Sequence, residues 1–285
     1  MKALLKVGAV RLAWSFRRLY CPVKKDALVL EVGSGGSPYF RANVLLDAYE
    51  STRERHWAPL ITDRPSVLGY GECLPFKDQV FDFVIASHVL EHSSDPESFL
   101  NELQRVSKAG YIETPDAFME RINPYWDHRL EVSNIDKKLV IKKKSGWCID
   151  PELSQLYERR AKNIIANKTI PENPFNFHVR FYWKGCIDYL IVNAEVDSAW
   201  DEPGLSHNTL MADTLRARAG RVFLRFARRV FSQNRRNASL DLYKLLQCPK
   251  CSSDVTKIND ESLLCENCKS NYGIKENIPN FIEVK

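Results

Sequence analysis

The chain has 285 residues, 44% of them apolar, which is enough for a domain of roughly 200 residues and a smaller second one. No stretch approaches the 18 or more apolar residues that a membrane-spanning helix requires. The net charge is only +5, but residues 1–25 contain seven Lys and Arg and residues 215–236 contain eight Arg, with no acid in either segment. This uneven charge concerns partners rather than fold.

The first 20 residues are basic and partly apolar. Lys6 and Arg11 interrupt the apolar stretch and no small-residue cleavage site follows, so we expect a retained helix rather than a signal peptide. Of the eight cysteines, four stand in two tight pairs near the end and four are scattered. A chain of this length needs no disulfide framework, and we therefore expect a reducing, cytoplasmic location.

Short apolar runs alternate with helical stretches along the first part of the chain. Strands are predicted at residues 27–32, 43–47, 81–86 and 111–115. Asp95 and Pro96 are typical of a helix start, and the apolar residues of 98–108 fall on one helical face. This alternation predicts an α/β fold, with a parallel sheet and helices on both of its faces.

The pattern is lost over residues 117–178, an aromatic-rich insert with a hairpin-like strand at 138–142. We expect the insert to cover the acceptor site, where its aromatic side chains either stack on sugar or base rings or form ordinary core. Residues 177–192 predict two strands around Lys184-Gly185. The predicted domains are 1–198, a linker and basic helix over 199–240, and a small domain over 241–285.

Acidic residues accompany a glycine turn at the end of the first predicted strand. Glu31 stands two residues before Gly33, in the sequence Glu-Val-Gly-Ser-Gly-Gly, and Asp47 ends the next strand. Glycines let a backbone approach a ligand closely at such a turn. Glu31 can meet the amino group of a methionine moiety, and Asp47 is placed for ribose hydroxyls. A Gly-x-Gly sequence alone is weak evidence, since dinucleotide enzymes share it.

Further motifs follow in residues 72–92, where Glu-Cys-Leu-Pro-Phe precedes Phe-Asp-Phe-Val-Ile-Ala-Ser-His-Val-Leu-Glu-His. From about Val29 to Pro115 the chain resembles the type-11 family of class I methyltransferases. The resemblance implies a Rossmann-like, seven-stranded sheet, S-adenosylmethionine (SAM) as methyl donor and S-adenosylhomocysteine as product. It also implies the cofactor-binding residues: Glu31, Gly33, Ser34 and Gly35 at the methionine end, Asp47 at the ribose, Glu72, Cys73 and Leu74 at the adenine, and Ser87 and His88 over the donor.

The chain departs from the family pattern at Ser37, at Tyr70 and in the loop Lys108-Ala109-Gly110. These departures concern adenine contacts and helix packing more than the donor site. They leave open a domain that binds SAM without catalysis.

The candidate catalytic residues are His88, Glu91 and His92, which follow the fourth predicted strand. Open α/β sheets bind ligands at that edge, and a hydroxyl acceptor needs a base that removes its proton. His88 either shapes the SAM pocket or acts in catalysis, and for His92 the two interpretations are balanced. His128 and His178, in the insert, are weaker candidates.

The cysteine pairs Cys248, Cys251 and Cys265, Cys268 form a C-x2-C-x13-C-x2-C pattern. Four thiolates at this spacing fit a closed, tetrahedral, structural Zn²⁺ site. The segment from Leu246 to Phe281 is similar to the small zinc-ribbon family that binds and activates methyltransferases of tRNA, rRNA and a release factor. Its fusion here implies that the ribbon docks on its own catalytic domain or on a partner protein.

Residues 215–231 predict an amphipathic helix, with apolar residues on one face and arginines on the opposite face. Such a helix binds an anionic membrane surface, packs as an ordinary surface helix, or contacts RNA backbone.

The sequence thus favours methyl transfer to a hydroxyl of a glycan, a lipid-linked saccharide or a small metabolite, in the cytoplasm and peripheral to the inner membrane face. The alternatives are a tRNA or rRNA methyltransferase and a non-catalytic SAM-binding adaptor.

Overall fold

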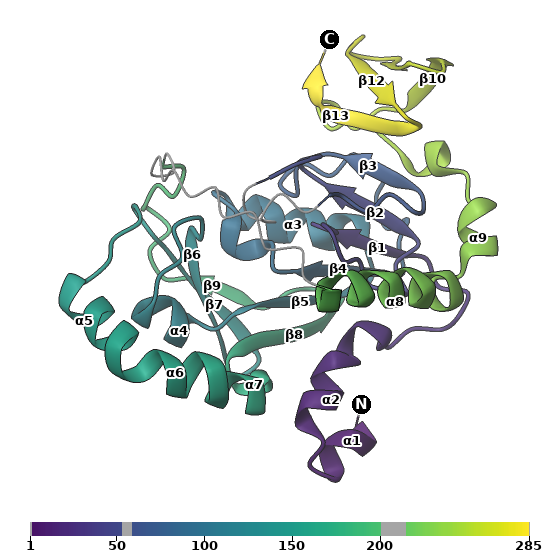
Figure 1. The fold of residues 1–285 in the computed structure, drawn as a ribbon. Helices are drawn as coiled ribbons and strands as arrows, with labels where there is room; N and C mark the ends of the chain where they lie inside the picture. The colour runs from purple at the N-terminus through teal and green to yellow at the C-terminus, as the bar shows by residue number, and fades with distance from the viewer. Residues whose placement is uncertain (1, 53–58, 201–214, 285) are drawn as a thin grey trace.

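The computed structural model describes residues 2–52, 59–200 and 215–284, and side chains within 4–52, 59–200 and 222–282. Most of the strands lie in one large sheet, with the N-terminal helices and the C-terminal strands at opposite ends of the molecule (Figure 1). None of the helices in the described ranges combines the length and apolar character needed to cross a membrane.

Six strands from the first 200 residues form the main part of the large sheet, in the order β3-β2-β1-β4-β5-β8. They are β1 (Val29–Val32), β2 (Val44–Asp47), β3 (Ser66–Leu68), β4 (Phe83–Ser87), β5 (Ala109–Pro115) and β8 (His178–Lys184). The first five run parallel, and β8 is antiparallel to β5. The predicted α/β class is confirmed, and the carboxyl ends of the parallel strands meet at one edge.

The second strand predicted within 177–192 does not join this sheet. It is β9 (Tyr189–Ile191), which pairs in parallel with β7 (Lys138–Lys143). β7 also pairs with β6 (Leu130–Ile135), and the three strands form a separate sheet. The first 200 residues therefore contribute six described strands to the large sheet where the family resemblance implied seven.

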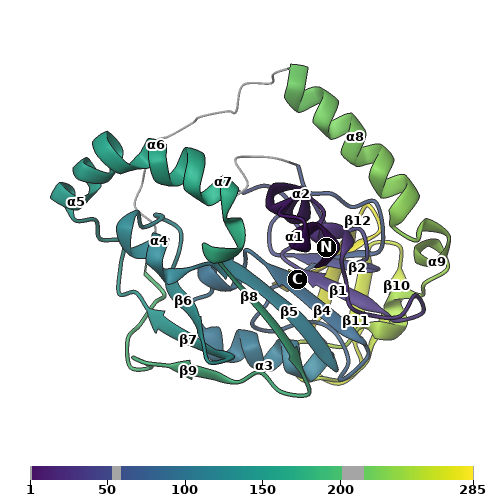
Figure 2. The same cartoon turned by 90° about the horizontal axis from the view of Figure 1, so that it is seen from below.

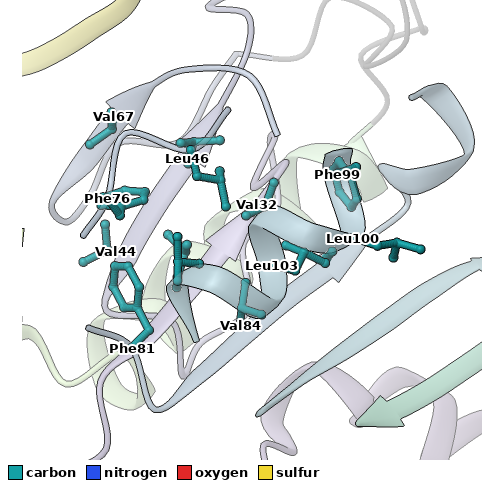
Figure 3. Close-up of a cluster of buried hydrophobic side chains, with 14 of the residues drawn as sticks. Val32, Val44, Leu46, Val67, Phe76, Phe81, Val84, Phe99, Leu100 and Leu103 are labelled. Atoms are coloured by element: carbon teal, nitrogen blue, oxygen red, sulfur yellow. The ribbon is translucent and has the colours of Figure 1, made fainter. Parts of the chain in front are cut away.

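One face of the large sheet is covered by α3 (Pro96–Val106), which begins where Asp95 accepts a hydrogen bond from the Ser98 N–H. Its buried side chains Phe99, Leu100 and Leu103 pack on strand residues of β1, β2 and β4 (Figure 3). Burying each such side chain contributes about 1.5–3 kcal/mol. This packing fixes β1 beside β4, the strands whose carboxyl ends carry the predicted site residues.

The opposite side carries helices from both ends of the chain, so that α2 lies between α7 and α8 (Figure 2). The N-terminal segment is divided at Gly8, whose φ is +74°, into α1 (Lys2–Lys6) and α2 (Val10–Ser15), followed by η1 (Arg17–Leu19). The expected single helix over residues 1–20 is therefore interrupted.

The insert over 117–178 is more regular than the sequence predicted. It contains, besides β6 and β7, the elements α4 (Ala117–Ile122), α5 (Pro151–Leu156), η3 (Tyr157–Ala161), α6 (Lys162–Ile164), η4 (Ile165–Thr169), α7 (Ile170–Glu172) and η5 (Pro174–Asn176). Residues 151–172 are thus helical almost throughout. η2 (Leu90–His92) follows β4 and leads toward the insert.

The C-terminal strands extend the large sheet beyond β3. They are β10 (Val255–Asn259), β11 (Ser262–Cys265), β12 (Asn271–Lys275) and β13 (Ile278–Val284), antiparallel to one another. β13 pairs in parallel with β3 at Asn280 and Leu68, and the Lys77 ammonium lies 2.5 Å from Asp254. The small C-terminal domain is docked on the same chain's sheet.

α8 (Leu215–Phe231) and α9 (Asn234–Ala238) connect the two parts, and η6 (Leu242–Leu245) precedes the cysteines. α8 packs on the body through buried Ala227 and an ion pair of 3.0 Å between Arg228 and Asp63. Its apolar residues Val222, Phe223 and Phe226 are 66%, 68% and 66% exposed. The helix predicted at 215–231 is present, and its described apolar face points away from the protein.

Candidate active site

The turn after β1 is held closely against β2 and β4. Gly33 has a φ of +68°, and a Cβ at this position would lie 1.9 Å from Val89 Cγ2. The Gly33 and Ser34 N–H groups donate to the Leu46 carbonyl at 2.8 and 3.1 Å. Glycine at position 33 therefore meets both a conformational and a steric requirement of the turn.

Asp47, at the end of β2, is buried and organises this turn. Its carboxylate accepts hydrogen bonds from the Gly35 N–H at 2.8 Å and from the Tyr49 N–H at 3.1 Å. Asp47 therefore connects the glycine turn with the end of the neighbouring strand. An acid held at this place can also accept hydrogen bonds from a ligand that enters the turn.

Glu31 is 3% exposed and accepts a hydrogen bond of 2.8 Å from the Tyr39 N–H. Burial raises the pKa of its carboxyl group to about 8, although this hydrogen bond and the charges of Arg18 and Arg64 lower it. A buried acid of this kind becomes charged when a cation binds beside it. Glu31 and the Ser34 hydroxyl both line the cleft described below.

The residues predicted at the adenine end are placed differently from one another. Glu72 lines the cleft and accepts a hydrogen bond of 2.6 Å from the Ser93 hydroxyl. Leu74 is 1% exposed and belongs to the core, and its N–H donates to Glu102. Cys73 is exposed and is not among the cleft-lining residues. Of the Glu72-Cys73-Leu74 segment, only the acid therefore faces the cleft.

His88 follows β4 with a φ of +58°, an uncommon backbone conformation for a residue other than glycine. Its Nδ1 lies 3.3 Å from Glu91 Oε1, and its Nε2 lies 3.4 Å from Glu113 Oε1. Burial lowers the pKa of His88, but the hydrogen bonds to Glu113 and Glu91 outweigh this and raise it to about 9. The ring therefore bridges two buried carboxylates.

Glu113 was not singled out in the sequence, although it has the largest number of charged partners at this edge. It lies in β5, is fully buried and pairs with Arg17 at 3.0 Å. The Ser87 and Tyr111 hydroxyl groups also donate to it. Burial raises the pKa of Glu113, but His88, Arg17 and Tyr111 together lower it well below its usual range. An acid within an otherwise apolar strand was the available signal.

A second group of polar residues comes from the insert. His128 is 7% exposed, and its Nδ1 lies 2.7 Å from Glu120 Oε2. The other Glu120 oxygen accepts a hydrogen bond from Lys144 at 2.7 Å. His92 Nδ1 lies 3.2 Å from the Asp127 carbonyl oxygen. The insert thus places His128 beside Glu91 and His92, with one donor atom of each within 4.8 Å of the others.

One cleft of about 1220 Å³ joins these features. Its lining includes Glu31, Gly33 and Asp47 on one side and His88, Glu91 and His92 on the other. Ser87 and His178 also line it, and the His178 ring lies 5.5 Å from that of His88. Apart from Cys73 and Leu74, the structure brings all the predicted cofactor and catalytic residues to one cleft.

The four predicted metal ligands form a separate cluster. Their sulfur atoms lie within 4.8 Å of one another, with Cys248 to Cys268 at 3.6 Å and Cys251 to Cys265 at 3.4 Å. Zinc–sulfur bonds of about 2.3 Å in a tetrahedron place the sulfurs about 3.8 Å apart. The Tyr272 hydroxyl lies 3.1 Å from the Cys248 sulfur and can donate to a thiolate. The donor set and spacing therefore fit one zinc ion.

Residues 30–112 match the family model described as a methyltransferase domain. An uncharacterised protein of Methanocaldococcus jannaschii is 43% identical over 44 residues, which are 15% of this chain and 22% of that protein. The match thus spans less than a quarter of that relative's length. The chain therefore contains a methyltransferase domain.

Solved structures with partial likeness include a complex of the Haloferax volcanii Trm112 methyltransferase activator with a protein described as a methyltransferase. That match has 15% identity and a TM-score of 0.36, and covers 64% of this chain and 96% of the other. A SAM-dependent methyltransferase of Thermotoga maritima matches at 17% identity and a TM-score of 0.29, with 58% and 66% covered. Likeness at these TM-scores says nothing of substrates or partners.

Proposed function

We propose that this chain binds SAM in the cleft and transfers its methyl group to a hydroxyl oxygen of an acceptor. The observation that carries the proposal is the single cleft that joins the glycine turn to the histidines and carboxylates following β4. The first set of residues suits a methionine and ribose moiety. The second set suits an acceptor that must lose a proton.

The residues of the turn fit the cofactor. The Ser34 hydroxyl is buried and has no hydrogen-bond partner among the described residues, so a ligand in the cleft can satisfy it. In this proposal Glu31 pairs with the cofactor's ammonium group, Asp47 accepts from the ribose hydroxyls, and Glu72 lies toward the adenine. The bound cofactor supplies an electrophilic methyl group.

The chain's own contribution to the reaction is alignment, exclusion of water and handling of one proton. His88 faces a carboxylate with each ring nitrogen, and we therefore assign it a positioning role. Glu91 and His92 lie closer to the insert, and we assign them to the acceptor. The insert closes this side of the cleft with aromatic residues that include Tyr125 and Trp126.

The acceptor class we favour is a glycan, a lipid-linked saccharide or a small metabolite. Support comes from α8, whose exposed face combines Phe223 and Phe226 with exposed Arg225 and Arg229. An ordinary surface helix would bury those rings, and a strip that binds only RNA phosphates needs no apolar face. We propose that α8 lies in the interface of an anionic membrane. The side chains of 215–221, with three further arginines, lie outside the described residues.

We further propose that the four cysteines hold one structural zinc ion, and that residues 1–198 and 241–285 are the catalytic and zinc-ribbon domains. In support, β13 pairs with β3, and Lys275 lies 3.0 Å from Glu50. The ribbon thereby covers an edge of the catalytic sheet, which agrees with docking in cis. A small domain of about 45 residues folds with help from its metal.

The test is transfer of labelled methyl from SAM into fractionated cell extract, with Asp47→Ala as the inactive control. We expect label in the lipid or glycan fraction with the wild-type chain and at least tenfold less with the variant. Label in RNA instead would establish the RNA alternative. Binding of S-adenosylhomocysteine without transfer to any fraction would favour the adaptor and contradict the proposed activity.

A further inference from the structure

Three metal-binding side chains meet where the insert approaches the end of β4. Glu91 and His92 come from η2, and His128 precedes β6. One donor atom from each lies within 4.8 Å of the other two, and all three residues line the cleft. The side chains of Glu91 and His128 are buried, whereas that of His92 is 21% exposed. An ion held there would face both the protein and the cleft.

The contacts of the two histidines assign their tautomers. Glu120 accepts a hydrogen bond from His128 Nδ1 at 2.7 Å, and the Asp127 carbonyl accepts from His92 Nδ1 at 3.2 Å. A proton on Nδ1 places the ring's lone pair on Nε2, the form in which a neutral imidazole binds a metal. Metal-binding histidines characteristically donate their other N–H to a carboxylate or a carbonyl. Both rings have this arrangement.

Two buried carboxylate oxygens beside these rings lack a hydrogen-bond donor. Glu91 is 2% exposed and Asp127 is 7% exposed. Glu91 Oε2 and Asp127 Oδ1 have no hydrogen-bond partner among the described residues. Leaving such oxygens unsatisfied in the interior is costly, so each calls for a compensating group. A cation between Glu91 and the histidines supplies that compensation.

We propose that Glu91, His92 and His128 bind one divalent cation of the zinc, manganese or iron class, which holds the oxygen of the methyl acceptor. Imidazole and carboxylate donors suit these ions, and three protein ligands leave positions open for a substrate. Bond lengths of about 2.0–2.2 Å draw donor atoms to roughly 3–3.5 Å apart, a small contraction from the present spacing. The role of the ion in methyl transfer rests on the proposed function, whereas the binding of the ion does not.

The step balances without any further reactant. The acceptor hydroxyl binds the cation and releases its proton to solvent, because the cation lowers the pKa of a bound oxygen. The resulting oxygen anion forms a bond to the methyl carbon of SAM. The carbon–sulfur bond breaks, its electron pair stays on sulfur, and S-adenosylhomocysteine leaves.

The test is the zinc content of the full-length protein after equilibration with Zn²⁺ and removal of unbound ion. We expect two zinc ions per chain in the wild type, one at the cysteines and one here. Glu91→Gln and His92→Asn should each hold one. His178→Asn lines the same cleft outside the cluster and should retain two. Glu120→Gln leaves the three ligands in place and should weaken the second site about 10–100-fold, as loss of a supporting carboxylate does.

Calorimetry with S-adenosylhomocysteine on the same samples separates the outcomes. Retained binding in a variant with one zinc shows that the cleft is folded and that the cation alone was lost. A wild type with one zinc, or variants that all keep two, would overturn the site. Two zinc ions without methyl transfer would leave the site standing and reject the proposed function, whereas methyl transfer with a single zinc would do the reverse.

Discussion

Gly33 and Val89 are in such close contact that the turn after β1 has no room for a side chain. A Cβ on Gly33 would lie 1.9 Å from Val89 Cγ2. The contact joins the end of β1 to the residue that follows His88 in the chain. The methionine end of the cleft and the histidine cluster are therefore positioned by one steric constraint.

We predict that Gly33→Ala weakens binding of S-adenosylhomocysteine at least tenfold, because the turn must move away from Val89. Calorimetry measures the affinity, and thermal melting measures the stability. Gly8→Ala is a matched control, since Gly8 also has a positive φ, of +74°, but has no atom within 4 Å of the added Cβ. It should show only the backbone strain of about 1–2 kcal/mol and bind the ligand normally. Equal effects of the two substitutions would contradict the steric argument.

Glu31 makes binding depend on pH in a defined direction. Burial raises the pKa of its carboxyl group to about 8 in the free protein, so at neutral pH it is mainly protonated. A bound ammonium group favours the carboxylate, and binding should therefore release a proton. The affinity for S-adenosylhomocysteine should rise from about pH 6 toward the raised pKa, by up to tenfold per pH unit.

Calorimetry in two buffers of different ionisation enthalpy measures the proton released by Glu31. Glu31→Gln should bind more weakly and lose this component. Proton uptake in the wild type, or an affinity that falls over the same range, would rule out the assigned role.

Zinc removal should affect the ribbon more than the cleft. Cys265→Ser deletes one of four thiolates, so we expect metal analysis to show loss of the cysteine-bound zinc and melting to show a less stable chain. The free energy of unfolding should also fall because β13 pairs with β3. Binding of S-adenosylhomocysteine should persist, since the cleft lies at the carboxyl ends of the strands. Ser252→Ala, next to a ligand but outside the set, should change neither metal content nor binding.

The exposed face of α8 predicts sedimentation with anionic vesicles at low salt. Phe223→Glu should abolish it, because Phe223 is 68% exposed and can enter the lipid interface. Ile258→Glu is the control, since Ile258 is 56% exposed on the ribbon. A combined Arg225→Gln and Arg229→Gln variant should weaken binding, at about 1 kcal/mol per charge. Retention of binding by Phe223→Glu would make the attraction purely electrostatic and favour RNA.

The strands that carry the donor site could be predicted because their sequence patterns are local. β1, β2 and β4 are apolar runs followed by characteristic polar residues, and α3 has both an N-cap and one apolar face. β3 has only three residues, too few for a pattern, and was missed. The pairing of β9 with β7 was also missed, because pairing partners depend on residues distant in the chain.

The cleft was predicted in part for the same reason. Glu31 and Asp47 adjoin recognisable strands, whereas the ion pair of Arg17 with Glu113 joins residues 96 positions apart. His128 was a weaker candidate in the sequence because nothing near it indicates that the insert folds back onto Glu91. The exposure of the apolar face of α8 could not be predicted either, since periodicity identifies a face without its surroundings.

The measurement that tests the account most directly is calorimetry of S-adenosylhomocysteine with the wild type and Asp47→Ala. We expect the wild type to bind in the micromolar range and the variant to bind about 1–3 kcal/mol more weakly, because hydrogen bonds to a charged group are lost. Asp63→Ala, which removes an acid that pairs with Arg64 and Arg228, should bind as the wild type does. A wild type that does not bind, or an Asp47→Ala variant with unchanged affinity, would contradict the assignment of this cleft to SAM.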